Sequence, residues 1–136
     1  MNGVIKMSTD ADSLEQERDH EHTEHKLLMR NLTVSDYPDI KRIMELVYHS
    51  AGGALPEAKF RSILKTFPEG QICIEDDGKV IAAAFAVVVD YDKFGDKHTY
   101  MEITGNIYAT THDPKGDVLY GIDVFADPEY RNMRLG

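Results

Sequence analysis

The chain has 136 residues, of which 42% are hydrophobic, and it carries a formal net charge of −9. This length and composition predict a single globular domain with a hydrophobic core. The acidic balance argues against nucleic acid or an anionic membrane surface as a partner. No run of about 18 apolar residues is present, so we expect no membrane span. The lone Cys73 rules out an internal disulfide and favours a reducing cytoplasm.

Residues 1–25 read as a disordered acidic leader. They carry two basic and seven acidic side chains, few large apolar residues and no sustained periodicity. His20, His22 and His25 are spaced closely enough to suggest a metal site. Because neither a cysteine nor an ordered scaffold accompanies them, we interpret them as part of a solvated tail and expect no metal. Either Met1 or Met7 could be the true start.

The folded part is expected to begin at residue 26 with a short strand over residues 27–31, followed by two helices. The first helix has apolar residues at helical spacing and should stop at Gly52 and Gly53. The second should open at Pro56 and end near residues 68–70. The two predicted apolar faces consist of Ile40, Ile43, Met44, Val47 and Tyr48, and of Phe60, Ile63, Leu64 and Phe67.

Three further strands are predicted. Residues 71–75 alternate, with Cys73 as a buried and inert thiol, and residues 76–79 form a tight turn in which Gly78 supplies the positive φ. Residues 80–89 are almost continuously apolar, which predicts a central strand covered on both faces. The three alanines of this strand suggest close packing against a helix. Residues 91–117 look irregular, and a loop of that length is usually functional or disordered.

Residues 118–125 form the last predicted strand. Strict alternation would put Tyr120, Ile122 and Val124 on one face, and Gly121, Asp123 and Phe125 on the other. Pro128 should end the strand because proline cannot donate to a sheet ladder. The polar stretch that follows reads as a strand-to-helix loop, where free backbone N–H groups can hold a phosphate.

This last stretch carries a resemblance to a known family. Residues 127–136 resemble the acetyl-CoA pyrophosphate loop of the GCN5-related N-acetyltransferases, with the signature Q/R-x-x-G-x-G/A. Arg131 falls on the first position and Gly136 on the last, whereas Arg134 replaces the middle glycine. The order of the predicted elements is also that of the amino-terminal part of such a domain. The resemblance implies an α/β fold over residues 26–136, with a mostly antiparallel central sheet and flanking helices, truncated after the fourth strand and incomplete at the C-terminus.

A narrower resemblance concerns the amino-acid sequences of three segments, residues 67–75, 90–96 and 121–125. They are similar to acetyltransferase domains that precede a carbon–nitrogen hydrolase (nitrilase-like) domain in bifunctional proteins. The resemblance therefore implies such a hydrolase domain as a possible partner within the parent protein.

The resemblance further implies transfer of an acyl group from acetyl-CoA, a co-substrate, to a small-molecule or peptide amine. An acidic protein suits a cationic acceptor such as a polyamine or lysine. Asp123 and Tyr120 are the predicted catalytic residues, with Glu102, His98 and His112 as other possible bases. The family often has a carboxylate near the start of this strand, where this chain has Tyr120. The predicted acetyl-CoA-binding residues are Phe125, Ala126, Arg131, Asn132, Met133, Arg134, Leu135 and Gly136.

Two alternatives to an enzyme stay open at this stage. The chain could be a non-catalytic acyl-CoA-binding or regulatory module attached to a hydrolase domain. It could also be a fragment without activity of its own, because a phosphate loop without its following helix loses the helix dipole and several donors.

Overall fold

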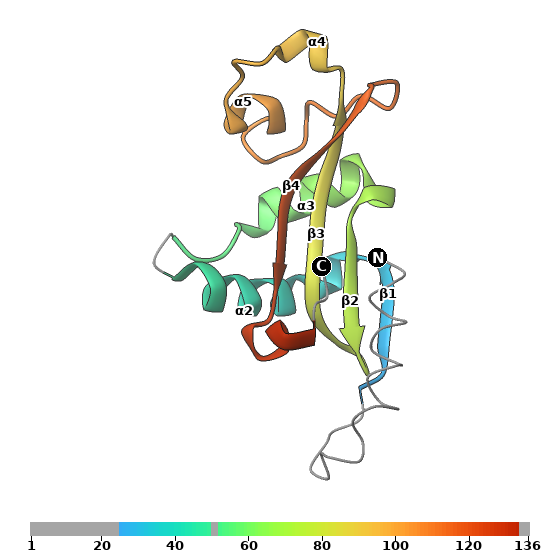
Figure 1. Cartoon of the computed structure of the whole chain (residues 1–136), viewed down its shortest axis with the longest axis vertical. Coiled ribbons are helices and arrows are strands. Elements are labelled where there is room, and N and C mark those ends of the chain that lie inside the picture. The colour runs from blue at the N-terminus through green and yellow to red at the C-terminus, as the bar shows by residue number, and fades with distance from the viewer. Residues whose placement is uncertain (1–24, 50–51, 134–136) are drawn as a thin grey trace.

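The computed structural model describes residues 25–49 and 52–133, which form a four-stranded antiparallel sheet in the order β1-β2-β3-β4. The predicted leader lies outside the described residues except for His25. Figure 1 shows α2 and α3 behind the sheet, and α4 and α5 beyond one end of β3 and β4. The elements are β1 Leu27–Asn31, η1 Val34–Asp36, α2 Tyr37–Tyr48, α3 Glu57–Thr66, η3 Pro68–Gly70, β2 Ile72–Asp76, β3 Lys79–Val89, α4 Tyr91–Phe94, α5 Tyr100–Thr104, β4 Val118–Ala126 and η4 Pro128–Met133.

The main hydrophobic core lies between the sheet and the two long helices. The apolar stripes predicted for α2 and α3 supply it, because residues three and four apart share a helix face. Alternate residues of β3 meet them from the sheet. The buried members from these three elements include Ile40, Ile43, Met44, Phe60, Ile63, Leu64, Ala83, Phe85, Val87 and Val89. The predicted fold class, an antiparallel sheet with flanking helices, is confirmed.

The hairpin between β2 and β3 forms as predicted. Asp77 and Gly78 both have positive φ values, 51° and 93°, which is the conformation of a two-residue hairpin turn. Cys73, the second residue of β2, is 1% exposed, and burial raises the pKa of its thiol to about 11. The prediction of a buried thiol is confirmed, and a thiol with so high a pKa is a poor nucleophile at neutral pH.

Strand β3 is an inner strand, as expected, but its two faces differ. On the helix side its residues are buried throughout. On the other face Ala82 is buried, whereas Ala84, Ala86 and Val88 are only partly buried. The expectation of cover on both faces therefore holds only for the first part of the strand, because α2 and α3 lie on one side of the sheet.

Residues 91–117 are more regular than the sequence indicated. Two short helices, α4 and α5, occur there, and α5 begins with a capping box between Thr99 and Glu102. Ile103 and Ala109 are fully buried in the main core, so this segment packs against the sheet. Figure 1 shows the segment as a cap at the upper end of β3 and β4. Among the described residues no helix is long and apolar enough to cross a membrane.

Candidate active site

A β-bulge in β4 organises the site. Phe85 of β3 lies opposite Asp123, but the next residue, Ala86, lies opposite Gly121, so Ile122 is the extra residue of the bulge. An extra residue shifts the alternation of side chains between the faces of the sheet. The expected strict alternation along β4 is therefore wrong.

The bulge brings consecutive residues to the helix side of the sheet. Ile122 and Phe125 are both buried in the main core, and Asp123 reaches helix α2. Val124, in contrast, is 68% exposed on the opposite face. Asp123 consequently faces the same side as the core residue that precedes it.

Tyr48, near the end of α2, holds Asp123. Its hydroxyl donates a hydrogen bond of 2.8 Å to Oδ1 of Asp123. Burial, and then this contact with a carboxylate, raise the pKa of Tyr48 to about 12. The phenol therefore stays protonated at neutral pH and keeps donating. The sequence pattern places Tyr48 only on the apolar face of the helix and does not indicate this role, because the partner lies 75 residues away.

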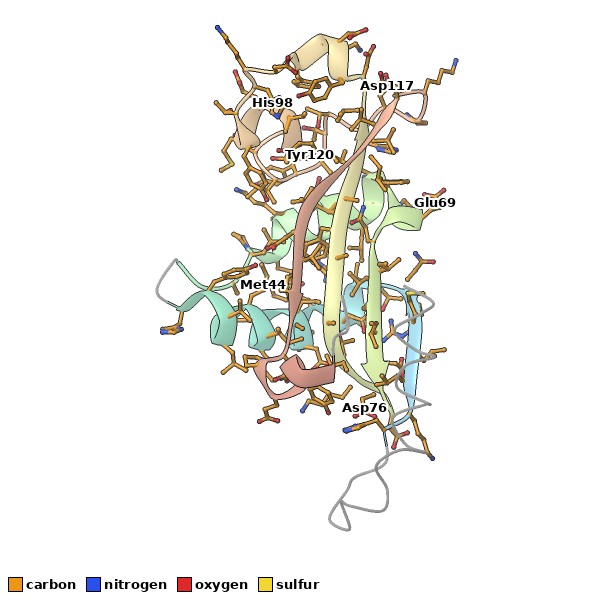
Figure 2. All side chains as sticks on the ribbon, viewed as in Figure 1. Met44, Glu69, Asp76, His98, Asp117 and Tyr120 are labelled. Carbon is orange, nitrogen blue, oxygen red and sulfur yellow. The ribbon has the colours of Figure 1, made fainter. Side chains whose placement is uncertain are left out.

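Asp123 lines a cavity of about 220 Å³. The cavity is partly open and lies between α2, residues 52–56, α3, β3, β4 and the segment around α5. Met44, which Figure 2 labels beside β4, marks its α2 wall. The lining residues are Met44, Gly52, Gly53, Ala54, Leu55, Pro56, Lys59, Phe85, Tyr100, Ile107, Ile122 and Asp123.

Tyr100 is a second tyrosine at the site that no sequence pattern indicated. Its hydroxyl donates to the carbonyl of Ile122 at 2.8 Å, so it satisfies a backbone acceptor freed by the bulge. Burial, followed by the nearby Asp123 and Tyr120, raises the pKa of Tyr100. Two protonated phenols, from α2 and α5, thus flank the bulge.

The predicted catalytic Tyr120 lies elsewhere. It packs partly against the main core and makes an edge contact with His98, with ring centroids 5.7 Å apart. Figure 2 shows both side chains near the upper end of β4, on the side of α5. Neither residue lines the cavity around Asp123. The structure therefore does not bring the two predicted catalytic residues together in this cavity.

The other predicted bases have local structural contacts. The carboxylate of Glu102 accepts the backbone N–H of Thr99 at 2.8 Å and caps α5. Nδ1 of His112 accepts the backbone N–H of Val88 at 3.1 Å, and the ring stacks on Phe67 at 4.2 Å. Neither side chain lines the cavity.

The end of β4 presents backbone donors at an open edge. Asp127 N–H donates to Ile81 at 2.7 Å, so these two residues form a hydrogen-bonded antiparallel pair. The neighbouring pair, Ala126 with Ala82, must then be a non-hydrogen-bonded pair, whose N–H groups point away from the partner strand. The N–H of Ala126 consequently points away from β3, whereas that of Phe125 points toward it. β4 is an edge strand of the described sheet, so nothing in that sheet pairs with the outer side.

The predicted pyrophosphate loop is described only in part. The backbone of Arg131, Asn132 and Met133 lies in η4, which Figure 1 shows turning away from the end of β4. Arg134, Leu135 and Gly136 lie outside the described residues. The assignment of this loop to acetyl-CoA stays a prediction.

No metal centre is evident in the described part of the chain. Among residues 25–49 and 52–133, no group of three or more histidine, cysteine, aspartate or glutamate side chains is arranged to hold a metal ion. Of the three closely spaced histidines, only His25 is described. Its Nδ1 lies 2.7 Å from Oδ2 of Asp76.

Known proteins resemble this chain in sequence, although no family model matches it. A probable hydrolase of Bacillus subtilis (strain 168), YhcX, is 36% identical over 115 residues, which cover 83% of this chain and 22% of YhcX. An uncharacterised N-acetyltransferase of the same organism, YkwB, is 31% identical over 113 residues, covering 77% of this chain and 50% of YkwB. The chain thus spans half or less of the length of these curated relatives.

Solved structures resemble the fold. The loading GNATL domain of CurA from Lyngbya majuscula has a TM-score of 0.65 at 20% identity, and the match covers 79% of this chain and 51% of that one. The GphF GNAT-like decarboxylase in complex with isobutyryl-CoA has a TM-score of 0.58 at 21% identity, with 77% and 51% covered. The fold is that of an acyltransferase-type α/β domain. Together with the sequence similarity to an N-acetyltransferase, these matches support the resemblance to the GCN5-related N-acetyltransferase superfamily.

Proposed function

We propose that this chain takes part in acyl transfer from an acyl-CoA, with acetyl-CoA as the donor, to an amine held in the cavity beside β4. The observation that carries the proposal is the position of Asp123. Its carboxylate lines a mostly apolar cavity and is oriented by the hydroxyl of Tyr48. A carboxylate placed in this way can accept a proton from an amine nitrogen.

The open edge of β4 supports the proposal, because its backbone N–H groups can hold the carbonyl of the acyl thioester. The outward N–H of Ala126 is a rigid backbone donor, of the kind that stabilises negative charge developing on a carbonyl oxygen. The superfamily holds the pantetheine arm and the thioester carbonyl with backbone amides in this part of the strand. Residues 131–136 would then hold the pyrophosphate, as their resemblance to the family loop implies.

The proposed reaction balances without any further reactant. The amine nitrogen forms a bond to the acyl carbon, the carbon–sulfur bond breaks, and coenzyme A leaves as a thiol. An ammonium first loses one proton to solvent, which frees the nitrogen lone pair. Asp123 accepts the second proton as the nitrogen–carbon bond forms, and that proton ends on the departing sulfur. Tyr48 does not touch the amine in this scheme; it keeps the carboxylate in one orientation.

The test is release of free thiol from acetyl-CoA in the presence of a panel of amines, in the natural protein that carries this chain. Asp123→Asn is expected to lower kcat about a hundredfold or more, because removing a general base typically costs 10²- to 10⁴-fold. The Kd for acetyl-CoA should change little. Asp92→Asn, at an exposed position of α4, is the matched control and should retain activity. Full activity in Asp123→Asn would contradict the assigned role.

A second candidate function is a non-catalytic acyl-CoA-binding or regulatory module joined to a carbon–nitrogen hydrolase domain. The 36% identity to a probable hydrolase, of which this chain would cover only 22%, favours it. A protein that binds acetyl-CoA in calorimetry but releases no thiol with any amine would support this candidate. We also propose a cytoplasmic location, which the unpaired and buried Cys73 favours.

A further inference from the structure

Two charged side chains line the β4 cavity without an opposite charge as partner. Among the described residues, Asp123 accepts a hydrogen bond from Tyr48 but has no cation within ion-pair distance. Lys59, from α3, has no carboxylate within that distance either. Its Nζ lies over the ring of Tyr108, 5.5 Å from the centroid. Asp123 and Lys59 thus both line the cavity, from β4 and from α3, while the Nζ of Lys59 rests on Tyr108, which is not a lining residue.

The rest of the lining is largely apolar and the space is small. A volume of about 220 Å³ is below the range of roughly 300–1,000 Å³ usual for drug-sized ligands. A space of this size suits a ligand smaller than a drug-sized molecule. The apolar lining side chains are Met44, Leu55, Pro56, Phe85, Ile107 and Ile122.

We infer that the acceptor is a free amino acid with a small apolar side chain, a zwitterion whose ammonium group faces Asp123 and whose carboxylate faces Lys59. This inference rests on the proposed function, since it names the substrate of that same site. The side chain of the amino acid would occupy the apolar part of the cavity, and its burial there would favour binding.

A polyamine fits this site poorly, although the net charge of the chain is −9. A second ammonium group would meet either Lys59, a like charge, or apolar carbon, and both cost free energy. The charges that line the cavity therefore disfavour a polyamine acceptor, although the acidic composition of the whole chain favours one. A simple alkylamine fits the apolar part but leaves Lys59 without a partner.

The experiment compares L-leucine with two analogues that each lack one of its charged groups and with one polyamine. L-leucine carries both charges, 3-methylbutylamine lacks the carboxylate, 4-methylpentanoate lacks the ammonium, and spermidine is a polyamine. Binding is measured by calorimetry and acyl transfer by thiol release from acetyl-CoA. L-leucine is expected to bind at least tenfold more tightly than the other three and to be the preferred acceptor.

Lys59→Met tests the carboxylate contact, since methionine keeps an unbranched apolar stem and removes the charge. This change should weaken the binding of L-leucine at least tenfold and leave the affinity for 3-methylbutylamine unchanged. Lys65→Met, at an exposed position of the same helix, is the matched control and should alter neither. Equal thermal midpoints of the variants would show that both fold.

The outcomes separate this inference from the proposed function. If spermidine or 3-methylbutylamine is acylated as well as L-leucine, the inference is overturned and acyl transfer stands. If L-leucine binds with the expected dependence on Lys59 but no thiol is released, the proposed transfer fails and the amino-acid site stands. If L-leucine does not bind, or binds equally well to Lys59→Met, the inference is overturned.

Discussion

Asp127 ties the end of β4 to helix α2 through its carboxylate. Nη1 of Arg42 donates to Oδ2 of Asp127 at 2.8 Å, and Nη2 donates to the carbonyl of Val80 at 3.0 Å. Oδ1 of Asp127 accepts the N–H of Glu129 and so starts η4. Asp127 is 1% exposed. One buried carboxylate therefore anchors three elements immediately before the predicted pyrophosphate loop.

Arg42→Met should lower the free energy of unfolding by about 2 kcal/mol, because Asp127 keeps its burial but loses its cation. Removing one partner of a fully buried pair costs about 3–5 kcal/mol, and we expect less here because the side chain of Arg42 is 35% exposed. Urea titration at pH 7 measures the change. Arg61→Met removes an exposed pair with Glu57 and should cost less than about 0.5 kcal/mol. Equal effects of the two substitutions would contradict the anchoring role.

The same pair predicts a pH dependence. Burial alone would raise the pKa of the Asp127 carboxyl, but hydrogen bonds from Arg42 and from the N–H of Glu129 hold it below its ordinary value. A group with a depressed pKa stabilises the fold above its unfolded pKa, about 3.9 for aspartate, and loses this effect as the pH falls through the folded pKa. The stability gap between the wild type and Arg42→Met should therefore narrow as the pH falls from about 5 to 3. A constant gap over that window would argue against a charge effect.

At the scale of elements, the bulge in β4 decides the chemistry of the site. A regular strand would send Ile122 and Asp123 to opposite faces. The extra residue lets both lie on the helix side, one in the core and the other beside Tyr48. Bulges often re-aim side chains next to functional sites in this way. The bulge disturbs the ladder of backbone hydrogen bonds between β3 and β4. The hydrogen bond from the Tyr100 hydroxyl to the carbonyl of Ile122 partly offsets this loss.

Phe85 of strand β3 pairs with Asp123 at the bulge, and its side chain is buried in the main core. This ring is 1% exposed and contacts Phe60 and Phe125, with centroids 6.1 and 5.7 Å apart. Phe85→Ala should cost about 3–5 kcal/mol of unfolding free energy, the range for buried aromatic residues. Leu119→Ala, at a site that is 67% exposed, should change stability by less than about 0.5 kcal/mol. A loss below about 1 kcal/mol for Phe85→Ala in urea titration would show that this ring is peripheral.

At the scale of the whole molecule, an acidic chain is proposed to bind a polyanionic co-substrate. A net charge of −9 offers no long-range attraction to coenzyme A, so local donors must supply the affinity. The expected donors are the backbone N–H groups at the end of β4 and in the loop that follows. Of the two arginines in that loop, Arg131 occupies the first position of the family signature.

Arg131→Ala is expected to weaken acetyl-CoA binding more than tenfold in the natural protein, since a hydrogen bond to a charged group is worth about 1.5–3 kcal/mol. Calorimetry gives the Kd directly. Thermal unfolding offers a second readout, because acetyl-CoA at a hundred times its Kd should stabilise the wild type by about 2.7 kcal/mol. Arg61→Ala, on the exposed face of α3, is the control. Unchanged affinity in Arg131→Ala would contradict the assignment of the loop.

The elements of this protein could largely be predicted from its sequence, because local periodicity and turn chemistry specify them. The apolar spacing in α2 and α3, the turn at Asp77 and Gly78, and the apolar run of β3 all predicted their structures closely. The resemblance of residues 127–136 to the family loop was also visible as a motif, and its role in binding acetyl-CoA stays a prediction. Asp123 could be selected as a candidate because a carboxylate in the middle of an apolar strand is unusual.

The tertiary structure alone decided how the site is assembled. Whether a strand contains a bulge depends on its register with a neighbour, so the side on which Asp123 lies could not be read from alternation. In the sequence, Tyr48 is an ordinary residue of an apolar helix face and Tyr100 an ordinary loop residue. Only the fold places their hydroxyls against Asp123 and the carbonyl of Ile122 in β4. Asp123 and Lys59, 64 positions apart in the chain, likewise come to line the same cavity only in the folded structure. Contacts at such separations follow from how the elements pack, which local sequence patterns do not encode.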